Sequence, residues 1–217
     1  MELSNSVCLI TGATGGIGRE VALSLGREGA TLALTGRRNQ ELSDLAAAIE
    51  SPTSIHLCDL SDPAATSGLA DAALATHGRV DVLINLAGAK VTGPIAALSV
   101  DDIQRSLQVN AIAPLRLAGR LGPMMAERGS GVIANVTTVV ASGKRNLGAY
   151  SGSKAALESM TQSLRQELTA KGVAVFSWDP GWVRTGMSPD GTEEPELAAG
   201  RLVEHIRIGK SSRETLT

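Results

Sequence analysis

Short runs of apolar, often β-branched residues alternate along this chain with longer stretches rich in Ala and Leu. Runs of this kind are typical of strands buried on both faces, and the longer stretches are typical of helices. Strands that alternate with helices imply right-handed crossovers and a parallel sheet with helices on both faces. The sequence therefore predicts an α/β fold: a doubly wound parallel sheet in three layers.

The alternation places each expected strand and helix. The strands are expected at residues 6–11, 30–35, 54–57, 80–85, 131–137 and 172–177. The helices are expected at residues 16–28, 39–50, 62–76, 100–127, 150–170 and 196–206. Within 100–127 we expect interruptions near Pro114 and Pro123, because proline lacks the N–H that a helix interior uses. No linker or repeat divides the 217 residues, so we expect a single domain over 1–217, with 186–217 as a short, variable C-terminal segment.

Charge and composition exclude several classes of function. The formal net charge is −2, and Lys and Arg are spread along the chain, which argues against a nucleic-acid or membrane partner. The N-terminus lacks the pattern of a signal peptide, and no run approaches the ~20 apolar residues that span a membrane. Cys8, Cys58 and the three histidines show neither disulfide nor metal-ligand spacing. We therefore expect a cytoplasmic protein without a metal site.

Aromatic residues make up only 2% of the chain, with one Tyr, one Phe and two Trp. The core must therefore consist of Val, Ile, Leu and Ala, which suits a parallel sheet buried on both faces. Tyr150 is the only phenol. Any chemistry that requires a phenol thus has a single candidate in this chain.

A glycine-rich segment, TGATGGIG over residues 11–18, joins the first expected strand to the first expected helix. Glycine lets a pyrophosphate approach backbone N–H groups without a Cβ in the way, and the positive end of the following helix faces the phosphates. The spacing TGxxxGxG differs from the GxGxxG of two-domain dehydrogenases. The segment favours a dinucleotide-binding turn, and a simple tight turn is the alternative.

Further motifs follow the glycine-rich segment along the chain. They are CDL at 58–60, NLAG at 85–88, VNA with Asn110, YSGSK at 150–154 and PGWVRT at 180–185. On these motifs the chain, from about residue 6 to residue 185, resembles the short-chain dehydrogenase/reductase (SDR) family in its compact single-domain form. The resemblance implies a Rossmann-like fold and an oxidoreductase that transfers hydride between a nicotinamide cofactor and a carbonyl or alcohol.

The residues after the second expected strand select between the two nicotinamide cofactors. An acidic residue there would accept hydrogen bonds from the ribose 2′-hydroxyl and repel a 2′-phosphate. This chain has Gly36 followed by Arg37 and Arg38, and guanidinium groups pair well with phosphate. NADP(H) is therefore the expected cofactor, and two arginines in a solvated turn are the alternative.

The resemblance implies that a further set of residues surrounds this cofactor. Asp59 corresponds to the family residue that meets the adenine amino group, and Leu86 stands where the family usually has a second Asn. Val183 and Thr185 resemble residues that hold the nicotinamide carboxamide. With Arg37 and Arg38, the full implied set is Gly12, Thr14, Gly15, Gly16, Ile17, Gly18, Asp59, Leu60, Leu86, Ala87, Gly88, Tyr150, Lys154, Pro180, Gly181, Val183 and Thr185.

Tyr150 and Lys154 are four residues apart at the start of a helix, so their side chains share one face. A phenol has a pKa near ~10, and a nearby ammonium favours the phenolate and lowers that pKa. By resemblance, Tyr150 is the general acid in reduction and the base in oxidation, and Lys154 also binds the nicotinamide ribose. A surface contact between the two side chains is the alternative.

The family normally has a Ser at the end of the fifth strand that holds the substrate oxygen, and this chain has none there. The local pattern puts Thr138 in that place, with one residue deleted in the 142–148 loop, whereas Thr137 keeps the family's usual separation from Tyr150. Alternation along a strand points these two hydroxyls to opposite faces, so only one can serve. We prefer Thr138, and a weakened oxygen site is the alternative.

Asn110 lies in an expected helix, where Asn is a poor helix former, so a kink or a bound water is expected. It matches the family Asn that anchors a proton-relay water, and it completes the implied catalytic set of Tyr150, Lys154, Thr138 and Asn110. In the implied reaction Thr138 and Tyr150 polarise a carbonyl that accepts hydride from NADPH, and Tyr150 delivers the proton. The proton is replaced through the ribose, Lys154 and water near Asn110.

A small-molecule carbonyl compound or alcohol is the expected substrate. A pocket walled by Val139, Val140 and Trp182, with no evident cationic cluster, suggests an apolar carbonyl compound, although Trp182 could equally be plain packing. The resemblance also implies a homodimer formed through the helices at 101–125 and 150–170. The chain ends at Thr217, before the seventh strand of many relatives, and its last residues resemble the approach to that strand. Either the sequence is truncated or this edge of the sheet is unusual.

Two other functions stay open at this point. A catalytically weak NADP(H)-binding sensor or scaffold is favoured by the missing Ser and the short C-terminal region, and opposed by intact Tyr150, Lys154 and Asn110. A sugar-nucleotide epimerase or dehydratase would have a longer chain with a separate substrate lobe. Turnover of NADPH with a carbonyl compound separates the enzyme from the sensor.

Overall fold

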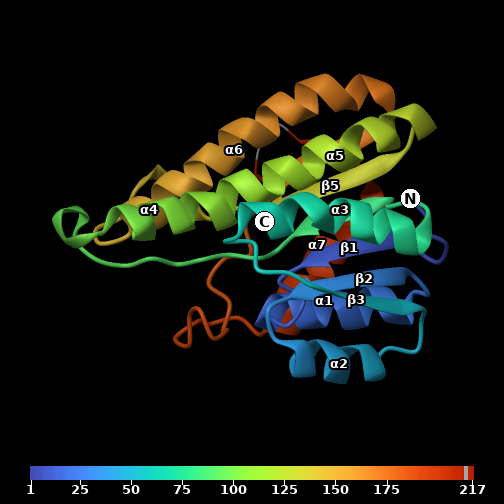
Figure 1. Ribbon diagram of the computed structural model, residues 1–217, viewed down its shortest axis with the longest axis horizontal. Coiled ribbons are helices and arrows are strands. Elements are labelled where there is room, and N and C mark those ends of the chain that lie inside the picture. The colour runs from blue at the N-terminus through green and yellow to red at the C-terminus, as the bar shows by residue number, and fades with distance from the viewer. Residues whose placement is uncertain (213–214) are drawn as a thin grey trace.

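The expected strands form one parallel sheet. The computed structural model describes residues 1–212 and 215–217 (Figure 1). Its six-stranded sheet has the order β3-β2-β1-β4-β5-β6, and all neighbouring strands run parallel. The strands are β1 Val7–Thr11, β2 Thr31–Gly36, β3 Thr53–Leu57, β4 Val82–Asn85, β5 Gly131–Val136 and β6 Val173–Trp178. The order and direction confirm the predicted doubly wound, Rossmann-like sheet.

Helices cover both faces of this sheet. They are α1 Gly16–Arg27, α2 Asn39–Ala47, α3 Pro63–His77, α4 Val100–Leu107, α5 Ala113–Arg128, α6 Gly148–Leu168 and α7 Pro195–Ile208. In Figure 1, α3, α5 and α6 lie on one side of the sheet, and α1 and α2 lie on the other. Helix α7 packs beside α1 on that second side. The three-layer prediction is therefore confirmed.

Alternate residues of the central strands enter two different hydrophobic cores. In β1, Cys8 and Ile10 are buried on the side of α1, α2 and α7, whereas Val7 and Leu9 are buried on the side of α3, α5 and α6. Since both sets are buried, residues 7–10 of the strand are all apolar, as expected for a parallel strand. Both cores consist mainly of Val, Leu, Ile and Ala, as the low aromatic content predicts.

The long helical region changes geometry around Asn110. A π-helical segment (η2), Gln108–Ile112, joins α4 to α5. The N–H of Ala113 bonds to the carbonyl of Gln108, five residues back. Pro114 lies in the first turn of α5, where its missing N–H costs little. The expected distortion near Asn110 is therefore a π segment.

The interruption expected at Pro123 is wrong, because α5 continues through this residue. Pro123 lies on the exposed side of the helix. Its neighbours Leu121 and Met125 are buried in the core. Burial of this apolar face holds the helix together across the one backbone hydrogen bond that proline cannot make.

The last described residues approach the outer edge of β6. Leu216 pairs in parallel with Trp178. The Leu216 N–H donates to the Ser177 carbonyl at 2.9 Å, and the Asp179 N–H donates to the Leu216 carbonyl at 2.7 Å. This pairing has the direction of a seventh parallel strand, as the ending of the sequence suggests. Residues 213–214 of the expected variable segment 186–217 lie outside the described residues.

Candidate active site

A cleft of about 1020 Å³ lies over the carboxyl ends of the strands. It sits beside β1 and β4, which are neighbours in the sheet and lead to helices on opposite faces. Ligands bind at such a switch point in doubly wound sheets. The lining includes every residue of the implied cofactor-binding set, together with Thr138, Tyr150 and Lys154. Asn110 is not part of the lining and lies behind it.

The glycine turn allows three segments to converge under the cleft. Gly12 has a φ of +68°, and a Cβ there would lie 2.8 Å from the Cα of Ala87, in the loop after β4. A Cβ on Gly16 would lie 2.9 Å from Cγ2 of Thr185, in the segment after β6. A Cβ on Gly18 would overlap the carbonyl oxygen of Gly12. Because side chains at these positions would separate the segments, the turn does more than reverse the chain.

The first turn of α1 presents N–H groups to the cleft. Its N-cap is Gly15, so the helix has no side-chain cap. The N–H groups of a first turn have no acceptor within their own helix and carry the positive end of its dipole. Gly15, Gly16 and Ile17 all line the cleft. This end of the cleft is therefore suited to a pyrophosphate.

Two guanidinium groups border the same end of the cleft. Nη2 of Arg38 donates to the carbonyl and hydroxyl oxygens of Thr14, each at 2.9 Å. Nη1 of Arg37 lies 3.7 Å from the carboxylate of Asp59. The side chains of Arg37 and Arg38 are 60% and 57% exposed. Each therefore keeps N–H donors that a further anion can reach.

A hydrogen bond from its backbone holds the loop after β4 against the end of β1. The N–H of Ala87 donates to the hydroxyl of Thr11 at 3.2 Å. Leu86, which replaces the family's usual Asn, packs against the core on the α1 side. The replacement therefore leaves the backbone of residues 86–88 along the cleft.

Asn110 links this loop to the helix that carries Tyr150. Its Nδ2 donates to the carbonyl of Ala89 at 2.9 Å, and its Oδ1 accepts from the Ala89 N–H at 2.8 Å. Nδ2 also donates to the hydroxyl of Ser153 at 2.9 Å, which donates to the Tyr150 carbonyl at 2.7 Å. The sequence assigned no role to Ser153, although it lies within YSGSK. The amide of Asn110 therefore orients the loop and α6.

Lys154 is buried beneath the cleft floor, with 3% of its surface exposed. Its Nζ donates to the carbonyl of Val136, the last residue of β5. Burial lowers the pKa of the Lys154 ammonium to about 8. An ammonium has three N–H donors, so two are left for other acceptors.

Tyr150 is half-buried in the same cleft. Burial raises the pKa of its phenol, and the carboxylate of Asp179 raises it further. This direction is opposite to the expected lowering by Lys154, because loss of hydration disfavours the phenolate and the Lys154 ammonium is bound to Val136. Asp179 was missed in the sequence. It directly precedes the Pro-Gly pair, is 3% exposed and accepts a hydrogen bond from the Gly181 N–H at 2.9 Å.

The two candidate threonines differ in access to the cleft. Thr137 is 2% exposed, and its hydroxyl is buried without a hydrogen-bond partner. Thr138 is partly exposed, and its hydroxyl accepts a long 3.5 Å bond from the Val140 N–H. Both threonines line the cleft, and Thr138 is the more exposed of the two, so its hydroxyl is the more accessible to a molecule there.

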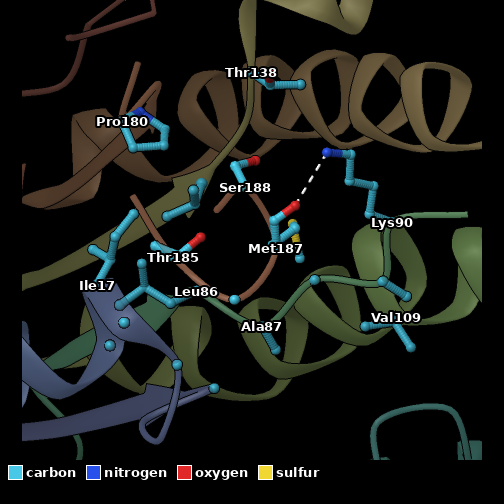
Figure 2. Close-up of a pocket in the computed structure, with 18 of the residues that line it drawn as sticks. Ile17, Leu86, Ala87, Lys90, Val109, Thr138, Pro180, Thr185, Met187 and Ser188 are labelled. Carbon is cyan, nitrogen blue, oxygen red and sulfur yellow. Dashed lines mark hydrogen bonds between the residues drawn. The ribbon is translucent and has the colours of Figure 1, made fainter. Parts of the chain in front are cut away.

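The far end of the cleft is bordered by loops (Figure 2). Nζ of Lys90, in the loop after β4, donates to the carbonyl of Met187 at 3.1 Å. Nζ of Lys144, in the loop before α6, lies 5.3 Å from the ring centre of Trp182. Trp182 is 45% exposed and lines the cleft, so it forms a wall. The expectation of a pocket without a cationic cluster is wrong, because residues distant in sequence bring two ammonium groups to it.

The chain and its fold have close parallels among known proteins. A family model for short chain dehydrogenases matches residues 6–196. The chain belongs to the short-chain dehydrogenase family. It is 36% identical over 219 residues to the dehydrogenase/reductase SDR family member 7B of Bos taurus, covering 95% of this chain and 67% of the relative.

Two solved short-chain dehydrogenases have the same architecture. One, from Sphingobium yanoikuyae in complex with NADPH, superposes with a TM-score of 0.87 at 26% identity, covering 95% of this chain and 86% of that one. A metagenomic short-chain oxidoreductase in complex with NADP superposes with a TM-score of 0.85 at 30% identity, covering 100% of this chain and 96% of that one. The coverage shows that the whole described fold is shared.

The donors of this short-chain dehydrogenase fit a nicotinamide dinucleotide. The uncapped start of α1 and Arg37 and Arg38 suit phosphates, and the free donors of Lys154 suit ribose hydroxyls. Within the described residues, no group of three or more His, Cys, Asp or Glu side chains could hold a metal ion. No helix there combines the length and hydropathy of a membrane-spanning segment.

Proposed function

We propose that this short-chain dehydrogenase is an NADP(H)-dependent ketone or aldehyde reductase, interconverting a carbonyl compound and an alcohol. One observation carries the proposal: Tyr150, Lys154 and the glycine turn line the same cleft. A phenol and a buried ammonium beside a phosphate-binding turn are the groups that carbonyl reduction requires. A protein that only stored or sensed the nucleotide would need the turn but not the pair.

Tyr150 and Thr138 have different roles at the carbonyl oxygen of the substrate. Bound NADPH supplies the hydride that adds to the carbonyl carbon. Tyr150 is protonated at neutral pH because its pKa is raised, so it can donate a hydrogen bond and then its proton to the oxygen. Thr138 donates a second hydrogen bond to the same oxygen. Hydride and proton together yield the alcohol and NADP⁺.

Lys154 and the π segment support return of a proton to Tyr150. The ammonium of Lys154 is held by Val136 and has donors left for a ribose hydroxyl. The α-helical donor for the Asn110 carbonyl would be residue 114, a proline that has no N–H. We propose that a relay water binds at this carbonyl, since the Asn110 amide is used in holding Ala89 and Ser153.

The preference for NADP(H) rests on Arg37 and Arg38. Both border the cleft, and Gly36 before them carries no carboxylate that would repel a 2′-phosphate. Asp59, with which Arg37 pairs, is the one carboxylate in the cleft lining. The complexes of two similar dehydrogenases with NADPH and NADP support this preference.

Consumption of NADPH with a panel of ketones and aldehydes tests the proposal, with Tyr150→Phe measured beside the wild type. The wild type should turn over at least one class of carbonyl compound. Tyr150→Phe should bind NADPH as tightly, measured by its fluorescence, and lose activity about 1000-fold, since a positioned general acid contributes about 10²–10⁴-fold. NADPH binding without turnover across the panel would favour the sensor or scaffold instead.

We also propose that the chain forms a homodimer through α4, α5 and α6. Ile103 in α4 and Ile112 in the adjoining η2 are 36% and 41% exposed, and a second copy of the chain at these helices would cover them. Light scattering after size exclusion should give twice the chain mass, and a clean monomer would refute the dimer. The cytoplasmic location stays a prediction from the sequence.

A further inference from the structure

Three of the chain's five lysines line the cleft, and the reaction uses only one of them. Lys154 is buried and catalytic, whereas Lys90 and Lys144 are exposed at the far end of the cleft. Lys90 comes from the loop after β4, and Lys144 from the loop that leads into α6. These loops are far apart in sequence, so their convergence on one cavity is a property of the fold.

Neither of these lysines has an anionic partner in the described part of the chain. The salt bridges there all use arginine as the cation. Lys90 donates instead to the neutral carbonyl of Met187, as Figure 2 shows, and Lys144 lies over the face of Trp182. Both ammonium groups therefore face neutral groups at the edge of an open cavity.

The cleft provides no carboxylate to neutralise them. Among the described residues that line the cleft, the only acidic one is Asp59, which lies 3.7 Å from Arg37 at the nucleotide end. Low-dielectric walls lined by charges of one sign attract small ligands of the opposite sign. The far end of the cleft is therefore a cationic pocket that remains after the nucleotide phosphates have their own partners.

We propose that this pocket binds an anionic group on the substrate, a carboxylate or a phosphate, through Lys90 and Lys144. This inference rests on the proposed carbonyl reduction and deepens it by naming the substrate class. The carbonyl end lies at Thr138 and Tyr150, and the anion lies at the mouth. The anion sets specificity, and the walls of Val139, Val140 and Trp182 cover the chain between the two groups.

An incoming anion is a better partner than the groups that the lysines now meet. An anion adds the Coulomb attraction of a full opposite charge, which the neutral Met187 carbonyl lacks, and an exposed cation–π contact is weak. The anion therefore displaces the Met187 carbonyl as the hydrogen-bond partner of Lys90. Since that bond joins the loop after β4 to segment 186–188, substrate binding removes this one link between them at the mouth.

Matched substrates test the inference in the full-length protein with NADPH. Levulinate is compared with levulinamide, and hydroxyacetone phosphate with hydroxyacetone, so that each pair differs only in the anion. Longer oxo acids then vary the separation of the two groups. The anionic member should have the higher kcat/KM by about 10-fold or more, as expected for ammonium groups at a partly exposed site. The better of the two anionic members identifies the group.

Lys90→Gln with Lys144→Gln should remove this difference without lowering kcat/KM for the neutral members more than about 3-fold. Lys171, an exposed lysine just after the C-terminal end of α6 and outside the cleft lining, provides the matched control, and Lys171→Gln should behave as the wild type. Equal kcat/KM for the anionic and neutral members in the wild type would overturn the inference. So would a preference that survives the double variant.

A binding measurement decides the inference even when no carbonyl compound is turned over. Trp182 is one of two tryptophans, and Lys144 lies over its ring, so an anion at Lys144 should change its fluorescence. Titration with levulinate should give a saturable change that the lysine double variant lacks, and Trp182→Phe should lose the signal. A saturable signal without turnover supports the pocket and refutes the reductase, whereas no signal in the wild type refutes the pocket.

Discussion

The two ends of the cleft are lined by different kinds of groups. At the nucleotide end, the pyrophosphate site consists of backbone N–H groups and glycines within one continuous segment, 11–18, and Arg37 and Arg38 border it. At the far end, the contacts come from side chains on loops that are distant in sequence, such as Lys90 and Lys144. Backbone contacts bind a feature that all dinucleotides share, whereas side chains on loops can change without altering the sheet. The comparison teaches that cofactor binding and substrate choice are separable in this fold.

Lys154 lies where the two ends meet, and its replacement should have the largest effect. Lys154→Met should lower kcat/KM for reduction by about 1000-fold or more, because a charged donor is lost from the reacting centre. Although its activity falls, the Lys154→Met variant should be more stable than the wild type. Burial lowers the pKa of Lys154 from 10.5 in the unfolded chain to about 8 in the folded one, so the charged form opposes folding at neutral pH.

The free energy of unfolding of Lys154→Met at neutral pH should therefore exceed that of the wild type by about 1 kcal/mol, after loss of the bond to Val136. In the wild type the penalty is present below about pH 8 and is relieved as the pH rises from 8 to 10.5. Urea denaturation of the wild type and the variant at neutral pH and near pH 10.5 measures these free energies of unfolding. A less stable variant would contradict the assigned effect of burial.

The two threonines provide a sharper test at the substrate end. Thr138→Val should lower kcat/KM by about 100-fold and leave NADPH binding unchanged, since one hydrogen-bond donor to the reacting oxygen is worth about that much. Thr137→Val removes a buried hydroxyl that has no partner, so it should keep activity and raise stability by about 1 kcal/mol. The opposite pattern would make Thr137 the oxygen-binding residue.

A change confined to the nucleotide end should affect the cofactor alone. Arg37→Gln with Arg38→Gln should lower kcat/KM for NADPH by about 10–30-fold, allowing for the exposure of both side chains. The value for NADH should stay within about 3-fold of the wild type. If kcat/KM fell equally for NADPH and NADH, the arginines would stabilise the turn and would not bind the 2′-phosphate.

The smallest effect is expected at Asp179, whose carboxylate raises the pKa of Tyr150. Alcohol oxidation requires the phenolate, so its rate rises with pH up to the pKa of Tyr150. Asp179→Asn removes the negative charge and should move this rise to lower pH, by less than about one pH unit. An unchanged pH profile would show that Asp179 acts only through its hydrogen bond to the Gly181 N–H.

The sequence predicts the sheet and the nucleotide end because the signals there are local. The strand runs, the glycine segment and the two arginines each lie within a few residues of the element that they define. The same holds for Tyr150 and Lys154, which are one helical turn apart. The boundaries differ from those expected by at most three residues, since the hydrophobic period defines the element but not its last turn.

The rest of the site depends on contacts between distant residues. Lys90 and Lys144 belong to none of the sequence motifs. Asp179 affects the pKa of Tyr150 only because β6 ends beside α6. The continuity of α5 through Pro123 depends on the buried faces of its neighbours, which a rule about proline does not include. The expected lowering of the Tyr150 pKa failed because the spacing in sequence ignores burial.

A crystal structure with NADPH and an unreactive ketone analogue tests the central claim most directly. The Tyr150 hydroxyl should lie within hydrogen-bonding distance of the analogue's oxygen, about 2.6–3.2 Å, with the reactive face of the nicotinamide on the same side. Lys154 should contact the ribose, and Arg37 or Arg38 the 2′-phosphate. A Tyr150 hydroxyl turned out of the cleft, with the nucleotide bound, would contradict the reductase and leave only the nucleotide-binding fold.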